Sequence, residues 1–303
     1  MLTRDECVTV RDLNPQWSAS NTTGLIVEIV FAAGCGDVIL SVGMLFNAST
    51  SASEVRLVGN SATLSFDLES RPPGNGSPRL LTMSRGAPPV SLHNLTLRGA
   101  LAVDGGLLKM FDCAVEENSD AASNGGALLL TGGRVEATRT AFARNTARNG
   151  GAVYVDGGTA TFANCTLTEN TATHQGGALH VHRGSVVLRD HTLLSSNFAR
   201  STGEDRGDSI FTSNASHAEY QTPCPLGRWI VPDSSCPIRT DGPDASSYAS
   251  MRLLGHTNLD FPYECAPGYY GSSDGCREQT TPFCTGPCAE GQYCLAGTVI
   301  PQK

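Results

Sequence analysis

The sequence is poor in charged and aromatic side chains: of 303 residues, 17% are charged and 6% are aromatic. Lys and Arg together number 21 against 29 Asp and Glu, which gives a net charge of -8. A chain with this balance is not expected to present a basic surface that neutralises a phosphate backbone. Nucleic acid is therefore excluded as an expected partner.

The sequence also lacks an uninterrupted apolar run. Its most apolar stretch, residues 24–46, contains Glu28, Asp37 and four glycines, so it predicts two buried strands rather than a membrane-spanning helix. The first residues show no positively charged region followed by an apolar segment, so no secretory signal is visible. Because the C-terminal region has an extracellular character, we expect a fragment or incomplete gene product whose signal and membrane anchor lie outside this chain.

The usual signatures of catalysis are missing. No Gly-rich loop with a following Lys indicates nucleotide binding, and no cofactor is expected. The sequence therefore favours a protein that is not an enzyme.

The sequence does contain a repeat. Gly-Gly-Ala occurs at residues 125–127, 150–152 and 176–178, and each copy is followed by alternating apolar residues, a turn, a second strand pattern and an Asn. The second Gly of each copy is Gly126, Gly151 or Gly177, and the Asn that ends it is Asn145, Asn170 or Asn197; a fourth, degenerate copy ends at Asn118. Four copies in one register indicate a solenoid.

A period of 25 to 27 residues filled with short strands leaves no room for a helix in each unit. We therefore predict an all-β fold, a right-handed parallel β-helix of about eight coils over residues 1–217. A linker with the start of a Cys-rich region is expected at 218–262, and a Cys-rich module at 263–303. Residues 201–220 are expected to cover the last coil, since an open solenoid end invites self-association.

The repeated residues have structural roles in this fold. Gly at a tight corner supplies a positive φ and close approach, and a repeated Asn stacks amide on amide along the solenoid. Strand alternation predicts which side chains of the first strand of each coil point inward: Leu101, Val103, Leu128, Leu130, Val153, Val155, Leu179 and Val181.

The Gly-Gly-Ala triplets and the paired endings, such as Phe142-Ala-Arg-Asn145, resemble the repeat of chlamydial polymorphic outer-membrane proteins. They are also similar to β-helix surface proteins of algae and other protists. The resemblance covers residues 99 to about 210 and implies a β-helix exposed at a cell surface.

The eleven cysteines fall into three groups. Aligned coils place Cys113, Thr140, Cys165 and His191 in one column, so the two cysteines are two rungs (about 10 Å) apart and are expected to be free buried thiols. Cys7 and Cys35 are candidates to pair with each other. The remaining seven are disulfide candidates in a tail too polar to form a core: Cys224, Cys236, Cys265, Cys276, Cys284, Cys288 and Cys294.

The alternative for the tail is a zinc site, because Cys284 and Cys288 have a metal-like separation; only one such close pair is present, which favours disulfides. The segments that begin at Cys265 and Cys288 resemble ephrin-receptor-like and growth-factor-receptor-like modules. This resemblance implies an extracellular location. The odd number of cysteines suggests a module truncated at the end of the chain.

The outward positions of the first strands hold the candidate ligand-binding residues, Tyr154, Asp156, His180 and His182. The two histidines are read as solvated surface side chains, and a metal site is not expected. If the protein were a carbohydrate-active enzyme, Asp104 and Asp156 would be its acids, because two rungs (about 10 Å) lie near the upper separation of an inverting glycosidase. No motif of a polygalacturonase or pectate lyase supports this alternative.

The sequence also contains two kinds of surface motif. Arg206-Gly207-Asp208 spells an integrin-type tripeptide but occupies a degenerate corner position. Six sequons are candidates for N-glycosylation: Asn21, Asn47, Asn75, Asn94, Asn164 and Asn214. The sequence thus predicts a non-catalytic extracellular or cell-surface protein for adhesion, glycan binding or structural display, with glycans or surface and matrix proteins as partners and any membrane attachment through segments not in this chain.

Overall fold

In the computed structural model, most of the described residues lie in β-strands. The described residues are 8–12, 26–31, 37–40, 44–50, 52–66, 79–202, 206–213, 216–221, 226–230, 250–253, 256–257, 259–272 and 281–303. No α-helix occurs among them, and accordingly none of these segments could cross a bilayer as an apolar helix.

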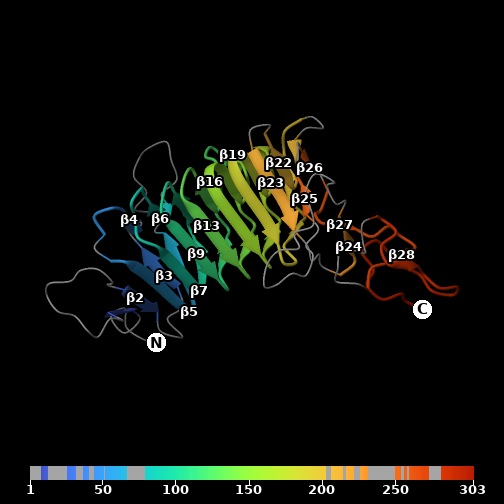
Figure 1. Cartoon of the computed structure of the whole chain (residues 1–303), viewed down its shortest axis with the longest axis horizontal. Helices are drawn as coiled ribbons and strands as arrows, with labels where there is room; N and C mark the ends of the chain where they lie inside the picture. The colour runs from blue at the N-terminus through green and yellow to red at the C-terminus, as the bar shows by residue number, and fades with distance from the viewer. Residues whose placement is uncertain are drawn as a thin grey trace.

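The strands stack into an all-β parallel β-helix, as the repeat predicts (Figure 1). Each coil contributes one strand to each of three columns, and strands within a column pair in parallel. The first column contains β4 (Met44–Phe46), β6 (Arg79–Met83), β8 (Ala100–Val103), β12 (Leu128–Leu130), the first parts of β16 (Val153–Ala163) and β19 (Leu179–Arg189), and β22 (Ile210–Thr212).

The second and third columns are built in the same way. The second contains β2 (Ile26–Phe31), the first parts of β5 (Glu54–Phe66) and β7 (Val90–Arg98), β9 (Leu107–Phe111), β13 (Arg134–Thr138), the second parts of β16 and β19, and β23 (Ser216–Gln221). The third contains β3 (Asp37–Leu40), the second parts of β5 and β7, β10 (Ala114–Glu116), β14 (Ala141–Ala143), β17 (Thr166–Thr168) and β20 (Leu193–Ser195). Short strands β11 (Ser119–Asp120), β15 (Thr146–Asn149), β18 (Thr171–Gln175) and β21 (Phe198–Ala199) form a separate narrow sheet.

The core runs along the axis of the coils. The eight inward positions predicted for the first column are confirmed, since each of these side chains is at most 1% exposed. In the other columns Phe142 and Phe162 meet edge to face at 5.5 Å. Burial of a side chain of this size contributes about 1.5–3 kcal/mol to the free energy of folding. The buried side chains of successive coils form one continuous apolar core.

The two glycines of each Gly-Gly-Ala corner have different structural roles. The first has a positive φ, for example +61° at Gly150, which favours glycine. The second lies against the next coil: a Cβ on Gly126, Gly151 or Gly177 would come within 2.0–2.3 Å of a backbone carbonyl oxygen. The corner therefore needs glycine twice, for conformation and then for space.

The C-terminal end of the solenoid differs from the prediction. Residues 210–212 and 216–221 form another parallel rung rather than a cover. The cover comes from the region expected to be a linker: β25 (Ser250–Arg252) and β26 (His256–Thr257) pair antiparallel with β23 and β22, and Phe261 pairs antiparallel with Leu194. The predicted boundary at residue 217 is therefore wrong, because it falls inside β23. At the opposite end β1 (Val8–Asp12) runs antiparallel to β2.

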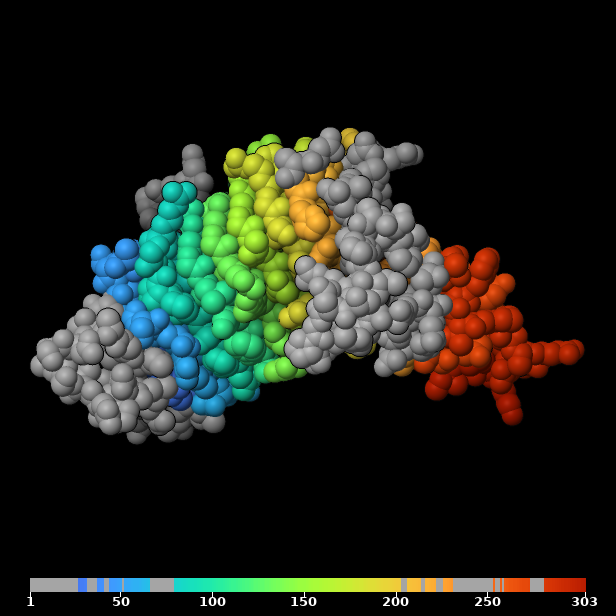
Figure 2. Space-filling model, in the orientation of Figure 1, coloured from blue at the N-terminus to red at the C-terminus, as the bar shows by residue number. Residues whose placement is uncertain are grey.

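The C-terminal module is small and held by disulfides. Cys265 is bonded to Cys284 and Cys288 to Cys294. The zinc alternative for Cys284 and Cys288 is wrong, because each sulfur is bonded to a different partner. Strands β24 (Arg228–Trp229) and β27 (Tyr263–Glu264) pair, as do β28 (Tyr269–Tyr270) and β29 (Gly286–Pro287); Figure 2 shows the module in red at one end of the banded stack of coils. Cys7, Cys35, Cys224, Cys236 and Cys276 lie outside the described residues.

Candidate functional site

The outward positions of the first column form a ladder of side chains that is buried at Tyr154 and His180 and half-buried at Leu129 and Phe211, rather than a solvated face. Leu129, Tyr154, His180 and Phe211 occupy successive rungs. The Tyr154 and His180 rings lie 5.0 Å apart, and the His180 and Phe211 rings 4.8 Å apart. Tyr154 is 9% exposed and His180 is 5% exposed. The interpretation of His180 as a surface histidine is therefore wrong.

Burial changes the chemistry of His180. It lowers the pKa of the imidazole to about 4, an effect that a hydrogen bond to the backbone of Gln175 opposes. Nδ1 is buried and has no hydrogen-bond partner. His182 remains half exposed, with its ring 6.4 Å from that of His180. Within the described residues, no three His, Cys, Asp or Glu side chains gather as a possible metal site.

Asp156 is held by an arginine that the aligned sequence does not place beside it. A β-bulge after Val155 shifts the register, so that Asp156 pairs with Arg183 instead of His182. Arg183 donates from Nε at 2.7 Å and from Nη2 at 3.0 Å to the two carboxylate oxygens. This bidentate contact lowers the pKa of Asp156. A general acid of a glycosidase needs the opposite shift.

Asp104, the other candidate acid, also has neighbours. Thr131 donates its hydroxyl to Asp104 at 3.1 Å, and Arg85 Nε lies 3.7 Å from the carboxylate. The structure therefore does not bring the two aspartates together as a free pair. The integrin-type tripeptide is likewise engaged within the chain: Arg206 donates to Asp208, whose other oxygen accepts from the Ala199 N–H.

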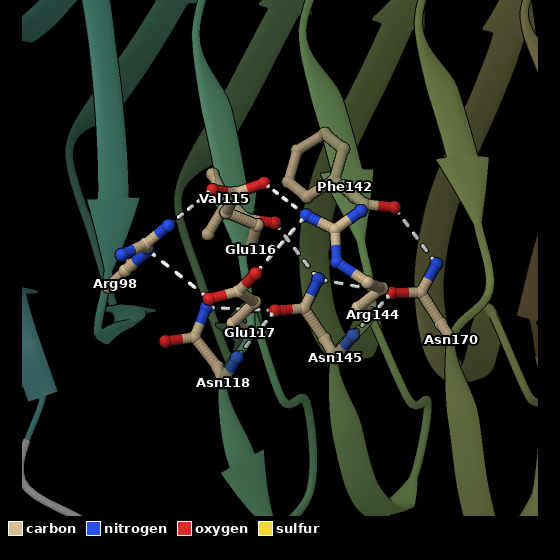
Figure 3. Close-up of polar contacts among 9 residues, drawn as sticks. All are labelled: Arg98, Val115, Glu116, Glu117, Asn118, Phe142, Arg144, Asn145 and Asn170. Carbon is tan, nitrogen blue, oxygen red and sulfur yellow. Dashed lines mark hydrogen bonds and ion pairs between the residues drawn. The ribbon is translucent and has the colours of Figure 1, made fainter. Parts of the chain in front are cut away.

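The repeated asparagines form a buried amide ladder, and Figure 3 draws its first three members, Asn118, Asn145 and Asn170. Nδ2 of Asn118 donates to Oδ1 of Asn145 at 2.8 Å, and the pattern continues to Asn170 and Asn197 at 3.0 Å each. The same Oδ1 atoms accept a backbone N–H from the preceding Asn, at 3.0–3.2 Å. Figure 3 also shows Asn170 donating to the carbonyl of Phe142 at 2.9 Å. Phe142 pairs with Leu167 of the next coil. An Asn three residues after the bulky residue of its own repeat is therefore placed to donate to the carbonyl of the bulky residue one coil earlier.

Beside the ladder, charged side chains alternate from coil to coil. Arg98 contacts Glu116 at 3.3 Å and Glu117 at 3.4 Å, and Arg144 contacts the same two carboxylates at 2.6 and 3.4 Å (Figure 3). These contacts are partly exposed, so each contributes little to stability alone. They leave the charges of this strip paired.

A groove lies at the corner between the second and third columns. At this corner one residue is left-handed in each of four successive coils: Asn94, Asp112, Arg139 and Asn164 have φ of 48–54°. The groove has a volume of about 510 Å³ and is lined by Ser61, Asn94, Leu95, Thr96, Asp112, Cys113, Ala114, Arg139, Thr140, Ala141, Asn164 and Thr166. Sequence reasoning did not identify it, although a polar residue recurs one position before the Cys113–Thr140–Cys165 column.

Small side chains hollow out this groove. Thr96, Ala114, Ala141 and Thr166 occupy equivalent outward positions on four successive coils, so two alanines stand between two threonines. Arg139 spans the middle coils, donating from Nε at 2.6 Å and Nη2 at 2.8 Å to Asp112. This contact lowers the pKa of Asp112. The groove is thus polar, and its central ion pair is neutral overall.

Residues 164–182 match the model of the Chlamydia polymorphic membrane protein (Chlamydia_PMP) repeat. The matched segment contains both Leu167-Thr-Glu-Asn170 and the corner Gly176-Gly177-Ala178. No curated protein and no solved structure matches the chain.

The matched segment also contains Cys165, which with Cys113 is a free buried thiol among the cysteines that the structure describes. Burial raises the pKa of Cys165 to about 11 and also raises that of Cys113. The residue aligned with Cys165 in the next coil is Thr192, not His191. The reason is that the corner before it contains two left-handed residues, Asp190 and His191, instead of one.

The described sequons differ in exposure. Asn94 and Asn164, the first residue of the PMP repeat match, are exposed at the corners of the groove, whereas Asn47 is half buried and accepts a hydrogen bond from the Ser49 N–H. N-glycosylation stays a prediction for all three. Asn21, Asn75 and Asn214 lie outside the described residues.

Proposed function

We propose that the chain is a non-catalytic solenoid displayed at the cell surface or outside the cell, where its coils present side chains for adhesion. The observation that carries this proposal is the PMP repeat inside a continuous parallel β-helix. The repeat's family is one of membrane proteins by its description, and the resemblance of the Cys-rich module to extracellular repeats points the same way.

The side chains support binding rather than turnover. Asp156 is paired with Arg183, and its pKa is lowered, so the carboxyl is ionised and already hydrogen-bonded near neutral pH. His180 is buried and has a pKa of about 4, so it is a poor general base in contact with solvent. These two groups would have to change partners or exposure before they could act on a substrate.

Two measurements test the proposal. An antibody against the solenoid should label intact, unpermeabilised cells of the native organism. The purified chain should release no new reducing ends and no unsaturated products from a panel of acidic and neutral polysaccharides. Turnover that disappears in Asp156→Asn but persists in a second aspartate variant, Asp190→Asn, would reject the non-catalytic part, and labelling only after permeabilisation would reject the surface location.

A further inference from the structure

The corner groove carries more specific information about a ligand. Its lining offers hydroxyl, amide and paired-ion groups from five successive coils around two alanines, with Ser61 on the first of these coils. Thr96 and Thr166 stand three coil steps apart, about 14 Å at ~4.8 Å per step. The groove therefore runs along the solenoid axis, across the strands.

A peptide strand is a poor match for this direction. Peptides that bind to sheets do so by pairing their backbone with an unpaired edge. Here the strands under the groove are paired on both sides; for example, the Ala141 N–H donates to Cys113 and the Thr166 N–H to Thr140. Only side chains remain to contact a ligand.

The charge pattern selects among polymers. The Asp112 carboxylate and the Arg139 guanidinium neutralise each other, and the other polar lining residues are uncharged. Arg139 has five N–H donors and uses two on Asp112, which leaves donors and carboxylate lone pairs for hydroxyl groups. An anionic polymer would gain no net attraction here.

From these features we infer that the groove between the second and third columns binds a neutral, linear polysaccharide lying along the axis. Coil spacing and the rise of an extended sugar chain are similar, so successive sugars meet equivalent positions on successive coils. The half-buried Ala114 and Ala141 give room for sugar rings, and Asn94, Asn164 and the threonines bond their hydroxyls. This inference names the ligand class for the proposed display function. It rests on that function in one respect, which is that the polymer is bound and is not cleaved.

Affinity electrophoresis of the full chain tests the inference, using gels cast with hydroxyethyl cellulose, glucomannan or xylan, and with polygalacturonate as the anionic comparison. The protein is made without N-glycosylation, because Asn94 and Asn164 stand at the two ends of the groove. We expect the neutral polymers to retard migration, and we expect added salt to leave the retardation unchanged.

Matched variants locate the site. Ala141→Leu fills the groove and should weaken binding at least about tenfold, while Ala102→Leu, at a half-buried outward position of β8, should not. Arg139→Gln should weaken binding and Arg183→Gln, which breaks the equivalent ion pair on the other face, should not. Unchanged retardation of Ala141→Leu and Arg139→Gln that remain folded by circular dichroism would overturn the inference.

Other outcomes are equally decisive. Free migration of the wild type in every neutral gel, or retardation by polygalacturonate alone, would overturn the assignment of a neutral ligand. A cleared zone in the stained polymer would instead contradict the non-catalytic function, and the comparison of Ala141→Leu with Ala102→Leu would still decide the groove.

Discussion

The hydrogen bonding of buried polar side chains in this protein depends on their position in the stack of coils. Asn145 and Asn170 are completely buried, and every amide hydrogen bond they make goes to a neighbouring coil. His180 is nearly as buried but leaves Nδ1 without a partner. The asparagine hydrogen bonds stabilise the stack of coils, whereas the buried His180 makes its stability depend on pH.

Removing an internal member of the amide ladder should be costly. Asn145→Ala removes the acceptor of both the backbone N–H and the side-chain amide of Asn118, and the donor to the Val115 carbonyl, at about 1–3 kcal/mol for each buried group. We expect a loss of about 3 kcal/mol or more in urea unfolding followed by circular dichroism. Asn118→Ala, at the first position of the ladder, is the control and should lose less. Equal losses in the two variants would contradict a ladder in which internal members carry more bonds.

The stability of the solenoid should fall as the pH falls from about 6.5 to about 4. Over this range the unfolded chain binds a proton at His180, whose ordinary pKa is about 6.5, while the folded chain resists it because its pKa is about 4. The difference amounts to about 3 kcal/mol. His174, His182 and Asp156 are the nearby titratable groups that influence this imidazole.

Thermal unfolding measured across this pH range checks the effect. His180→Leu, which repeats the residue found at position 129 of the same column, should flatten the dependence. His182→Leu should keep it, because that side chain is half exposed. A His180→Leu protein with the wild-type slope would show that other groups carry the proton linkage.

At the scale of elements, the ends of the solenoid differ from its middle. Internal strands pair in parallel, but the strands that close the stack pair antiparallel, as β25 and β26 do. Phe261 completes the closure: it is fully buried and packs edge to face on Tyr220 at 5.2 Å and on Tyr263 at 5.2 Å. The strand edges of the last coil are thereby covered.

Phe261→Ala should loosen this cover. The lost packing costs about 3–5 kcal/mol, and the freed edges of β20, β22 and β23 should pair with other molecules. Sedimentation velocity at several concentrations should show self-association that the wild type lacks. Leu259→Ala is the control, because Leu259 is 66% exposed. A monomeric, equally stable Phe261→Ala protein would refute the role of Phe261 in closure.

At the scale of the whole molecule, two modes of stabilisation lie end to end. The solenoid has a continuous apolar core and its described cysteines are free, whereas the module is held by disulfides and exposes large apolar side chains such as Leu295 and Ile300. The two regions should therefore respond differently to reduction.

Cys265→Ser with Cys284→Ser should unfold the module selectively, at a cost of about 2–5 kcal/mol. Limited proteolysis followed by mass spectrometry should show new cleavage after residue 262 and continued protection of residues 99–202. Loss of protection throughout the chain would mean that the solenoid depends on the module.

The sequence was sufficient for the parts of this molecule that repeat. The inward apolar positions and the stacked asparagines follow from a period, and a period can be read without coordinates. The pairing of Asp156 with Arg183 could not be predicted, because it depends on a one-residue bulge that no spacing reveals. The antiparallel cover formed by β25, β26 and Phe261 does not repeat in the sequence, so no period predicts it. The groove exists because Ala114 and Ala141 have small side chains, and small residues leave only a faint pattern in the sequence.

The antiparallel strands at both ends have an evolutionary consequence. The closing strands pair with strands at the two ends of the stack, so a unit of about 25 residues could be duplicated or deleted in the middle without altering these pairings. Each duplication would lengthen the molecule by ~4.8 Å and extend the corner groove by one step. Reach across a surface can thus be adjusted by unequal recombination, while solubility is maintained by ends that never change.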